Sequence, residues 1–228
     1  MARIVLITGA NRGIGRELGA QLAAGGDTVL LTARDEQKAI RAASEIGGDV
    51  HPIQLDASDQ ASVDAAAAKV AAQYGRVDVL VNNVGGLFGY DQQPSTVKLD
   101  KLQEVLDLNL IAKWRTTQAF LPLVRRSAHG RIVNVSSEAG SIARMGAHTA
   151  AYSASKAALN AFTAALAAEL EDEGITVHAA SPGWTATDLG GEGGRPVPEG
   201  AASIKHVVNL PADAGTGGFY QDEGIVPW

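Results

Sequence analysis

The chain alternates short apolar runs with longer alanine-rich segments that are apolar along one face. In the first run, Ile4-Val5-Leu6-Ile7, every position is apolar, which is typical of a strand buried on both faces of a sheet. We predict further strands over residues 28–32, 51–55, 77–81, 131–135 and 175–179. The run at 51–55 is the weakest of these, and the closing "TGGFYQDEGIVPW" predicts one last short strand.

Helices are predicted between these strands, over residues 14–24, 36–46, 59–74, 98–125 and 152–172. This repeated β-α order predicts a parallel sheet covered by helices on both faces. No shift in composition marks a boundary, so we expect residues 1–228 to form a single domain. The predicted fold class is α/β, a doubly wound Rossmann-type parallel sheet in three α/β/α layers. The Gly- and Pro-rich tract "GGEGGRPVPEG" predicts a flexible substrate loop over 189–205.

Composition narrows the class of protein. A net charge of −6 argues against a nucleic-acid surface, which needs clustered Lys and Arg. The apolar runs are far shorter than the ~20 residues that cross a bilayer, and no secretory leader is expected ahead of the first strand. Because the chain has no cysteine, it has no disulfide, thiol nucleophile or Cys-ligated zinc. We therefore expect a cytoplasmic protein that acts on a small molecule.

A glycine-rich turn follows the first strand directly. The sequence "TGANRGIG" places Gly9, Gly13 and Gly15 between that strand and the next helix, with Asn11, Arg12 and Ile14 among them. Glycines allow a tight turn there and let the backbone approach a pyrophosphate at the positive end of the helix. A plain β-α turn is the alternative, but the place of the turn after the first strand favours dinucleotide binding.

Tyr152 and Lys156 stand one helical turn apart in "AAYSASKAAL" and therefore share a helix face. Leu159, Leu166 and Leu170 continue the same stripe, so we expect the pair to face the sheet rather than solvent. A free tyrosine has a pKa of ~10, and a neighbouring ammonium favours its phenolate. Tyr152 is thus a candidate general acid/base. The alternative is a chance Tyr-x3-Lys spacing in a capped helix.

The motifs "TGANRGIG", "VNNVGG", "NVSS", "YSASK" and "SPGWTATD" occur in order along essentially the whole chain. In this the sequence resembles the short-chain dehydrogenases/reductases, and most of all the carbonyl-reductase-like members. It departs from them at Val84, where the family usually has Ala. The gap between the Ser and Tyr motifs is also about two residues longer than is common.

The resemblance implies four catalytic residues, Asn109, Ser137, Tyr152 and Lys156. Ser137 would stabilise a developing oxyanion, while Ser141 is an outside candidate for that role. Lys156 would hold the nicotinamide ribose and tune Tyr152. Asn109 would support a water chain to the lysine, or else be a satisfied core amide.

The cofactor is expected to be NADP(H) rather than NAD(H). Arg34 follows the second predicted strand and Arg12 lies in the glycine turn, so two guanidinium groups suit a 2′-phosphate. Asp35 is the opposing possibility, since an acidic residue there would favour NAD. With the residues that the resemblance implies, the cofactor-binding set is Gly9, Asn11, Arg12, Gly13, Ile14, Gly15, Arg34, Asp56, Ala57, Asn83, Tyr152, Lys156, Pro182, Gly183, Thr185 and Thr187.

The sequence thus predicts an oxidoreductase that moves a hydride between the nicotinamide and a carbonyl or secondary alcohol. A non-catalytic NADP-binding sensor or scaffold is the alternative, and a 3-oxoacyl-carrier-protein-type reductase is a possible specialisation. We expect the substrate pocket between the 138–151 loop, Trp184, the 189–205 segment and an aromatic wall at 86–90. The five His lack metal-ligand spacing, so no metal is expected. A homo-oligomer (dimer or tetramer) and a monomer both remain open.

Overall fold

The computed structural model describes residues 2–86, 93–147, 149–188 and 190–228. Its centre is one sheet in the order β3-β2-β1-β4-β5-β6-β7-β8, in which neighbouring strands are parallel except for the antiparallel pair β7 and β8. The strands are β1 Ile4–Ile7, β2 Thr28–Ala33, β3 Val50–Gln54, β4 Val79–Asn82, β5 Arg131–Val135, β6 Thr176–Ser181, β7 Phe219–Gln221 and β8 Gly224–Ile225.

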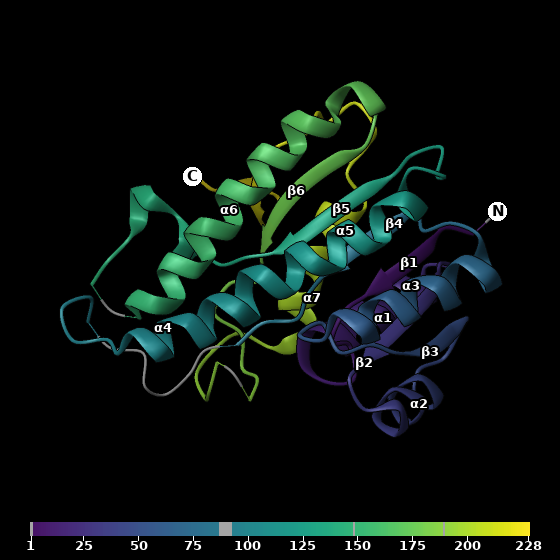
Figure 1. Ribbon diagram of the computed structural model, residues 1–228, viewed down its shortest axis with the longest axis horizontal. Coiled ribbons are helices and arrows are strands. Elements are labelled where there is room, and N and C mark those ends of the chain that lie inside the picture. Colours follow the sequence, from purple (N-terminus) through teal and green to yellow (C-terminus); the bar gives the residue numbers. More distant parts are fainter. Residues whose placement is uncertain (1, 87–92, 148, 189) are drawn as a thin grey trace.

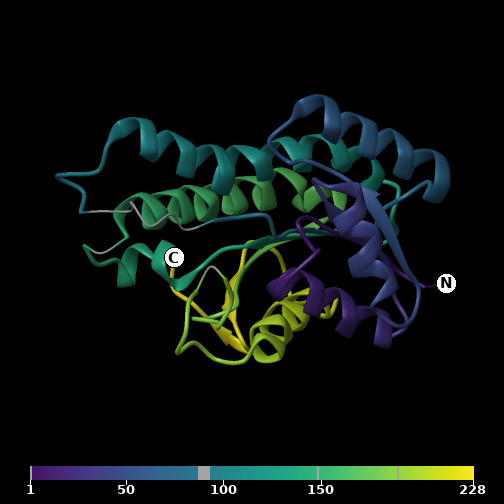
Figure 2. The ribbon, with the colours of Figure 1, turned by 90° about the horizontal axis from the view of Figure 1, so that it is seen from below.

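Helices cover both faces of this sheet, which gives three layers (Figure 1; Figure 2). The helices are α1 Gly13–Ala24, α2 Glu36–Ser44, α3 Gln60–Tyr74, α4 Leu99–Leu106, α5 Ala112–Val124, α6 Ala150–Leu170 and α7 Val197–Val208. Helices α3, α5 and α6 pack on one face, and α1, α2 and α7 pack on the other. A π-helical turn, Asp107–Ile111, joins α4 to α5.

Each face of the sheet has its own apolar core, and the alternation along β1 explains both. Leu6 points into the core beneath α3, α5 and α6, while Val5 and Ile7 point into the core beneath α1 and α7. All three side chains are fully buried. The continuous apolar runs of the sequence therefore reflect strands covered on both faces, and the predicted single-domain α/β fold is confirmed.

The prediction of a flexible loop over 189–205 is wrong for its second half. Helix α7 begins at Val197, with a proline at its start, and runs past the predicted end of the loop to Val208. Its buried residues include Ala201, Ile204 and Val208, which return at helical spacing and pack against the sheet. The preceding Gly and Pro residues concealed this apolar face in the sequence.

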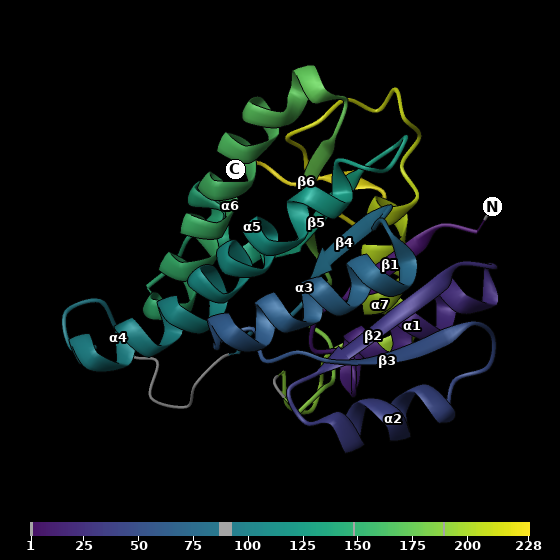
Figure 3. The same ribbon diagram turned by 45° about the vertical axis from the view of Figure 1, so that its right-hand side comes forward.

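The strand order reverses beside β1, which lies between β2 and β4. Figure 3 shows these three strands and β3 side by side, with α3 crossing one face. In open parallel sheets, ligands bind in the crevice beyond the carboxyl ends of the strands at such a reversal. The fold therefore brings the loops after β1, β2, β4 and β5 to one rim.

No helix in the described part of the chain is long and apolar enough to span a membrane.

Candidate active site

The glycine turn after β1 is built for close approach of a ligand. Gly9 and Gly13 have φ angles of +62° and +56°, a region that side-chain-bearing residues rarely adopt. A Cβ added to Gly15 would lie 2.5 Å from Nδ2 of Asn83. That amide donates to the carbonyl oxygens of Thr8 and Gly9 at 2.9 and 3.2 Å. Asn83 directly follows β4, the strand beside β1, so the turn is held in place from β4.

The amide groups at the start of α1 face this turn. No side chain caps the helix, and its first turn contains no acidic residue. Unsatisfied N–H groups and the helix dipole make such an end a site for an anion. The turn therefore fits the pyrophosphate of a dinucleotide, as the sequence predicts.

Arg34 and Asp35, the two candidates to contact the adenosine ribose, have different positions at the end of β2. The strand ends at Ala33, so Arg34 is the first residue beyond it. The Asp35 carboxylate instead caps α2, where it accepts a hydrogen bond from the backbone N–H of Lys38 at 3.1 Å. Asp35 is thus committed to the helix cap, whereas Arg34 lies directly at the end of the strand, where the residue for the 2′ position is expected.

Arg12, the second predicted phosphate ligand, pairs with Asp188. Its Nη1 donates to the Asp188 Oδ2, and both side chains are exposed. The ion pair joins the glycine turn to the loop after β6. Any anion bound by Arg12 therefore competes with Asp188.

Asp56 and Ala57 lie beyond β3, where the resemblance predicts the adenine. The hydroxyl of Ser58 donates to the Asp56 carboxylate at 2.6 Å and lowers the pKa of that carboxyl group, and the charges of Arg34 and Arg115 lower it further. Arg115 on α5 also donates to the Ala57 carbonyl at 2.8 Å. The sequence reasoning missed this arginine, which holds the predicted adenine loop in place.

A cleft of about 310 Å³ opens between β5, α6 and the loop after β6. Ser137, Tyr152 and Thr187 all line it, so the structure brings together three residues predicted from separate motifs. The exposed side chain of Trp184 forms another part of the wall, as predicted, and its indole N–H donates to the Gly190 carbonyl. Residues 87–90 of the predicted aromatic wall lie outside the described residues.

Lys156 is buried beside Tyr152. Its Nζ lies 5.4 Å from the centroid of the Tyr152 ring and donates to the Val135 carbonyl at 3.0 Å. Burial lowers the pKa of Lys156 to about 8. The predicted stripe is confirmed, because Leu159 and Leu170 on the same face are fully buried.

Three serines compete for the oxyanion role, and their hydrogen bonds distinguish them. The Ser136 hydroxyl donates to the Asn160 side chain at 2.6 Å, and the Ser141 hydroxyl donates to the Pro227 carbonyl at 2.7 Å. Ser137 lines the cleft at the end of β5, where its Oγ accepts from the Ala139 N–H at 3.2 Å. Within the described part of the chain its own O–H donates to no protein group, which distinguishes it from the other two hydroxyls.

Asn109 lies in the π-helical turn and is fully buried. Its side chain accepts from the Gly86 N–H and donates to the Gly86 carbonyl, both at 2.9 Å. It also donates to the hydroxyl of Ser155, the residue before Lys156, at 3.1 Å. A π-turn in a long helix is frequent at functional sites, and here it turns an amide inward against the helix that carries the Tyr and Lys.

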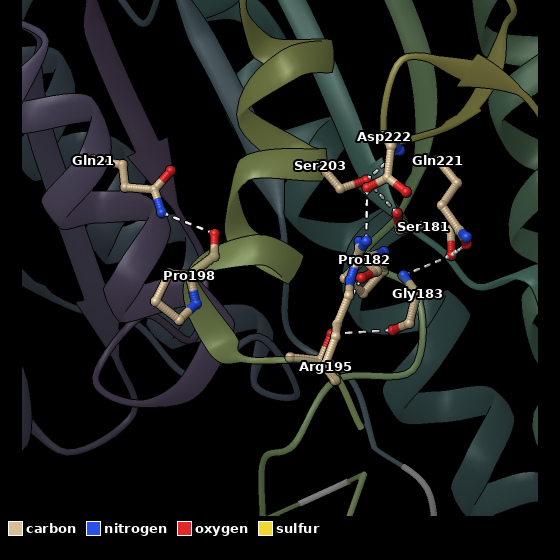
Figure 4. Close-up of polar contacts among 10 residues, drawn as sticks. Gln21, Ser181, Pro182, Gly183, Arg195, Pro198, Ser203, Gln221 and Asp222 are labelled. Atoms are coloured by element: carbon tan, nitrogen blue, oxygen red, sulfur yellow. Dashed lines mark hydrogen bonds and ion pairs between the residues drawn. The ribbon is translucent and has the colours of Figure 1, made fainter. Parts of the chain in front are cut away.

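The Pro182–Gly183 turn after β6 is braced by the end of the chain. The Ser181 hydroxyl donates to the Gln221 side chain at 2.8 Å and accepts from the Gly183 N–H at 3.2 Å. The Ser203 hydroxyl on α7 donates to the Ser181 carbonyl at 2.7 Å (Figure 4). The turn that carries two predicted cofactor ligands is thus fixed from α7 and β7.

Arg195 also contacts the Pro182–Gly183 turn, and the sequence did not predict its place there. Its Nη1 donates to the Asp222 carboxylate at 2.7 Å, and its guanidinium group packs against Gly183 (Figure 4). The buried Thr185 hydroxyl donates to the carbonyl oxygens of Pro182 and Gly183 at 3.1 Å each. The Gly- and Pro-rich tract gave no signal for the position of this arginine.

Comparison with known proteins identifies the family. Residues 3–195 match the sequence model of the short chain dehydrogenase family. The chain is 35% identical over 187 residues to the 3-oxoacyl-[acyl-carrier-protein] reductase FabG of Escherichia coli (strain K12), which covers 82% of this chain and 75% of that protein. It is 38% identical over 189 residues to the short-chain reductase protein NovJ of Streptomyces niveus, with 82% and 70% covered.

A solved structure extends the likeness to the whole chain. The NADPH-bound carbonyl reductase from chicken fatty liver aligns with a TM-score of 0.89 and 32% identity, over 100% of this chain and 94% of that one. The fold and the crevice at the strand-order reversal define the class of protein: a dinucleotide-binding protein of Rossmann type. The sequence match then gives the family: the chain belongs to the short-chain dehydrogenases, which are oxidoreductases.

Proposed function

We propose that this protein is an NADP(H)-dependent oxidoreductase that reduces a carbonyl group, or oxidises the corresponding secondary alcohol, with Tyr152 as general acid/base. The observation that carries the proposal is the cleft in which Tyr152 and Ser137 meet beside the buried Lys156. When bound, the nicotinamide supplies or accepts the hydride.

Tyr152, Ser137 and Lys156 have different roles in proton transfer and in stabilising the negative charge that develops. In the direction of reduction, the Tyr152 hydroxyl donates its proton to the carbonyl oxygen of the substrate. The Ser137 hydroxyl donates a hydrogen bond to the same oxygen as negative charge develops on it. The Lys156 ammonium favours the phenolate that remains on Tyr152, because an opposite charge nearby lowers the pKa of a phenol.

The cofactor preference rests on the two arginines. Arg34 stands directly after β2, and the competing Asp35 carboxylate is occupied as the cap of α2. Arg12 lies in the glycine turn after β1, the strand beside β2, and a phosphate bound there would take the place of its partner Asp188. Two guanidinium groups favour a 2′-phosphate through charge-assisted hydrogen bonds, which supports NADP(H) over NAD(H).

The comparisons support two substrate classes. A free aldehyde or ketone would follow the carbonyl reductase likeness, and a 3-oxoacyl thioester would follow the likeness to FabG. Tyr152 and Ser137 line the cleft, and a carbonyl of either class would use both side chains, so turnover of one class over the other distinguishes them.

The first test is a panel of aldehydes, ketones, quinones and a 3-oxoacyl thioester, with NADPH consumption followed by absorbance. We expect turnover of at least one of these carbonyl compounds. The Tyr152→Phe variant should lose about a hundredfold or more in kcat, the usual contribution of a general acid. It should keep the NADPH affinity of the wild type, measured by fluorescence titration.

Tyr74→Phe is the matched control, because Tyr74 lies on α3 beside His51 and outside the cleft. It should turn over at the wild-type rate. Equal rates for Tyr152→Phe and the wild type would refute the assigned role of Tyr152. NADPH binding with no turnover of any compound would instead favour a non-catalytic NADP-binding protein.

A further inference from the structure

A second buried lysine lies beneath the proposed active site. Lys113 on α5 is 1% exposed, and its Nζ donates to the carbonyl oxygen of Val135 at 2.5 Å. The same oxygen accepts a hydrogen bond from the Lys156 Nζ at 3.0 Å. Two side-chain amines, from two different helices, therefore converge on one backbone carbonyl at the end of β5.

Two ammonium ions do not share a buried site at low cost, so one of the amines is expected to be neutral. Burial lowers the pKa of Lys113 well below its usual value, and the charge of Lys156 lowers it further. Burial lowers the pKa of Lys156 to about 8, while the adjacent Lys113 side chain acts in the opposite direction. We therefore expect Lys113 to be the neutral amine, and Lys156 the ammonium, near neutral pH.

The charged and amide side chains on the elements around Lys113 bond to other groups, as four of the described residues show. Arg115 on α5 donates to the Ala57 carbonyl, and the exposed Asp107 accepts from Gln103. On the strands beneath α5, the polar side chains of Asn82 and Asn134 are uncharged and bond to each other. Among the described residues, Lys156 is thus the ionisable group with which Lys113 interacts.

We propose that Lys113 is a positioning residue for Lys156. In this role its neutral amine, which donates to the Val135 carbonyl, offers its lone pair to the neighbouring Lys156 ammonium and so holds that ammonium in its charged form beside Tyr152. This inference rests on the proposed function, because it makes Lys113 one of the residues that set the pH range in which Tyr152 acts as general acid/base.

The consequence for Tyr152 follows from the charge of its neighbour. Without an acceptor at position 113, the buried Lys156 ammonium loses a hydrogen bond, and the pKa of Lys156 falls further. Lys156 then becomes neutral at a lower pH, and the Tyr152 phenolate loses the cation that favours it. Alcohol oxidation, which needs the phenolate, should therefore require a higher pH.

The decisive measurement is the titration of the lysine side chains in the ligand-free protein, by NMR of lysine labelled at Cε and Nζ. Lys113→Met and Lys156→Met assign the two resonances. In the wild type we expect Lys113 to stay neutral at pH values where ordinary lysines are charged. Lys113→Met should lower the Lys156 midpoint from its position near 8. Lys113→Gln restores an acceptor and should keep the midpoint closer to that of the wild type.

The second readout is the pH profile of kcat/KM for alcohol oxidation. Lys113→Met should move the acidic limb upward by about one pH unit, so activity near neutrality falls roughly tenfold and recovers at high pH. A merely structural role would lower activity at every pH. Lys69→Met, an exposed lysine of α3, is the control and should leave both the profile and the titration unchanged.

The two readouts separate failure of this inference from failure of the proposed function. An unchanged Lys156 midpoint in Lys113→Met, or a Lys113 that is protonated at neutral pH, overturns the role of Lys113 whatever the activity. A shifted midpoint in a protein that turns over no carbonyl or alcohol supports the pairing of the lysines and overturns the oxidoreductase proposal instead.

Discussion

Arg34 is the residue on which the proposed choice between NADP and NAD depends. It follows β2 directly, while the neighbouring Asp35 is committed to capping α2. A hydrogen bond to a charged group contributes about 1.5–3 kcal/mol, so the loss of one such contact costs roughly ten- to a hundredfold in affinity.

Arg34→Asp should therefore lower kcat/KM for NADPH by roughly ten- to a hundredfold, because it removes the guanidinium and places a repelling carboxylate at the 2′-phosphate. The ratio of kcat/KM for NADPH to that for NADH measures the change. Arg41→Asp, an equal change of charge on the exposed side of α2, should leave this ratio alone. If both variants alter the ratio equally, the preference arises from the overall charge and not from Arg34.

At the scale of elements, one turn of 3-10 helix, Glu138–Gly140, packs against α6. The contact lies at Lys156. A Cβ added to Gly140 would lie 2.7 Å from both the backbone carbonyl carbon and the Cβ of Lys156. The atoms in the way belong to the helix, so a flexible side chain cannot give way. The loop that carries Ser137 and the helix that carries Tyr152 thus depend on a glycine for their spacing.

Gly140→Ala should push the two elements apart, at a cost of about 1–3 kcal/mol in the free energy of unfolding. Its turnover should also fall, because Ser137 and Tyr152 would no longer face one substrate oxygen. Gly146→Ala in the same loop meets no atom within 4 Å and serves as the control. Urea denaturation and kcat report the two effects; a fully active and stable Gly140→Ala would show that the elements readjust freely.

The sequence predicts elements well where burial on both faces leaves a continuous apolar run, as in β1 and β4. It predicts Tyr152 and Lys156 because both stand on the apolar stripe of α6. The π-turn is different: it inserts one residue into a helix whose apolar spacing looks regular, so the range 98–125 reads as a single helix.

Lys113 escapes prediction for a related reason. It follows Asn109 by four residues, the spacing that joins Tyr152 to Lys156, but a lysine on a helix usually lies in solvent. Only the packing of α5 against α6 reveals that both lysines reach one carbonyl oxygen. Contacts between helices distant in the sequence leave no local pattern.

At the scale of the whole molecule, a buried histidine links stability to acidity. His178 on β6 is fully buried, and its Nδ1 accepts from the Gly218 N–H at 3.3 Å. Burial, followed by the charge of Arg131, lowers the pKa of His178 from 6.5 to about 4. Between these values the unfolded chain binds a proton that the native protein does not, so stability is lost as the pH falls from 6.5 toward 4.

The loss should reach up to roughly 3 kcal/mol, because each unit of pKa difference corresponds to about 1.4 kcal/mol. His178→Asn keeps an acceptor for the Gly218 N–H and does not titrate, so its unfolding free energy should fall less between pH 6.5 and 4 than that of the wild type. His129→Asn, in an exposed loop, is the control. Parallel pH dependence of His178→Asn and the wild type would contradict this account.

The last residues of the chain reach the loop between Ser137 and Tyr152. The carbonyl of Trp228 accepts from the Ala143 N–H at 3.2 Å, next to the bond from Ser141 to Pro227. Any polypeptide joined after residue 228 must therefore leave beside the 138–151 loop, which the sequence predicts to border the substrate pocket. Purification tags and fluorescent fusions belong ahead of β1, at the opposite end of the sheet.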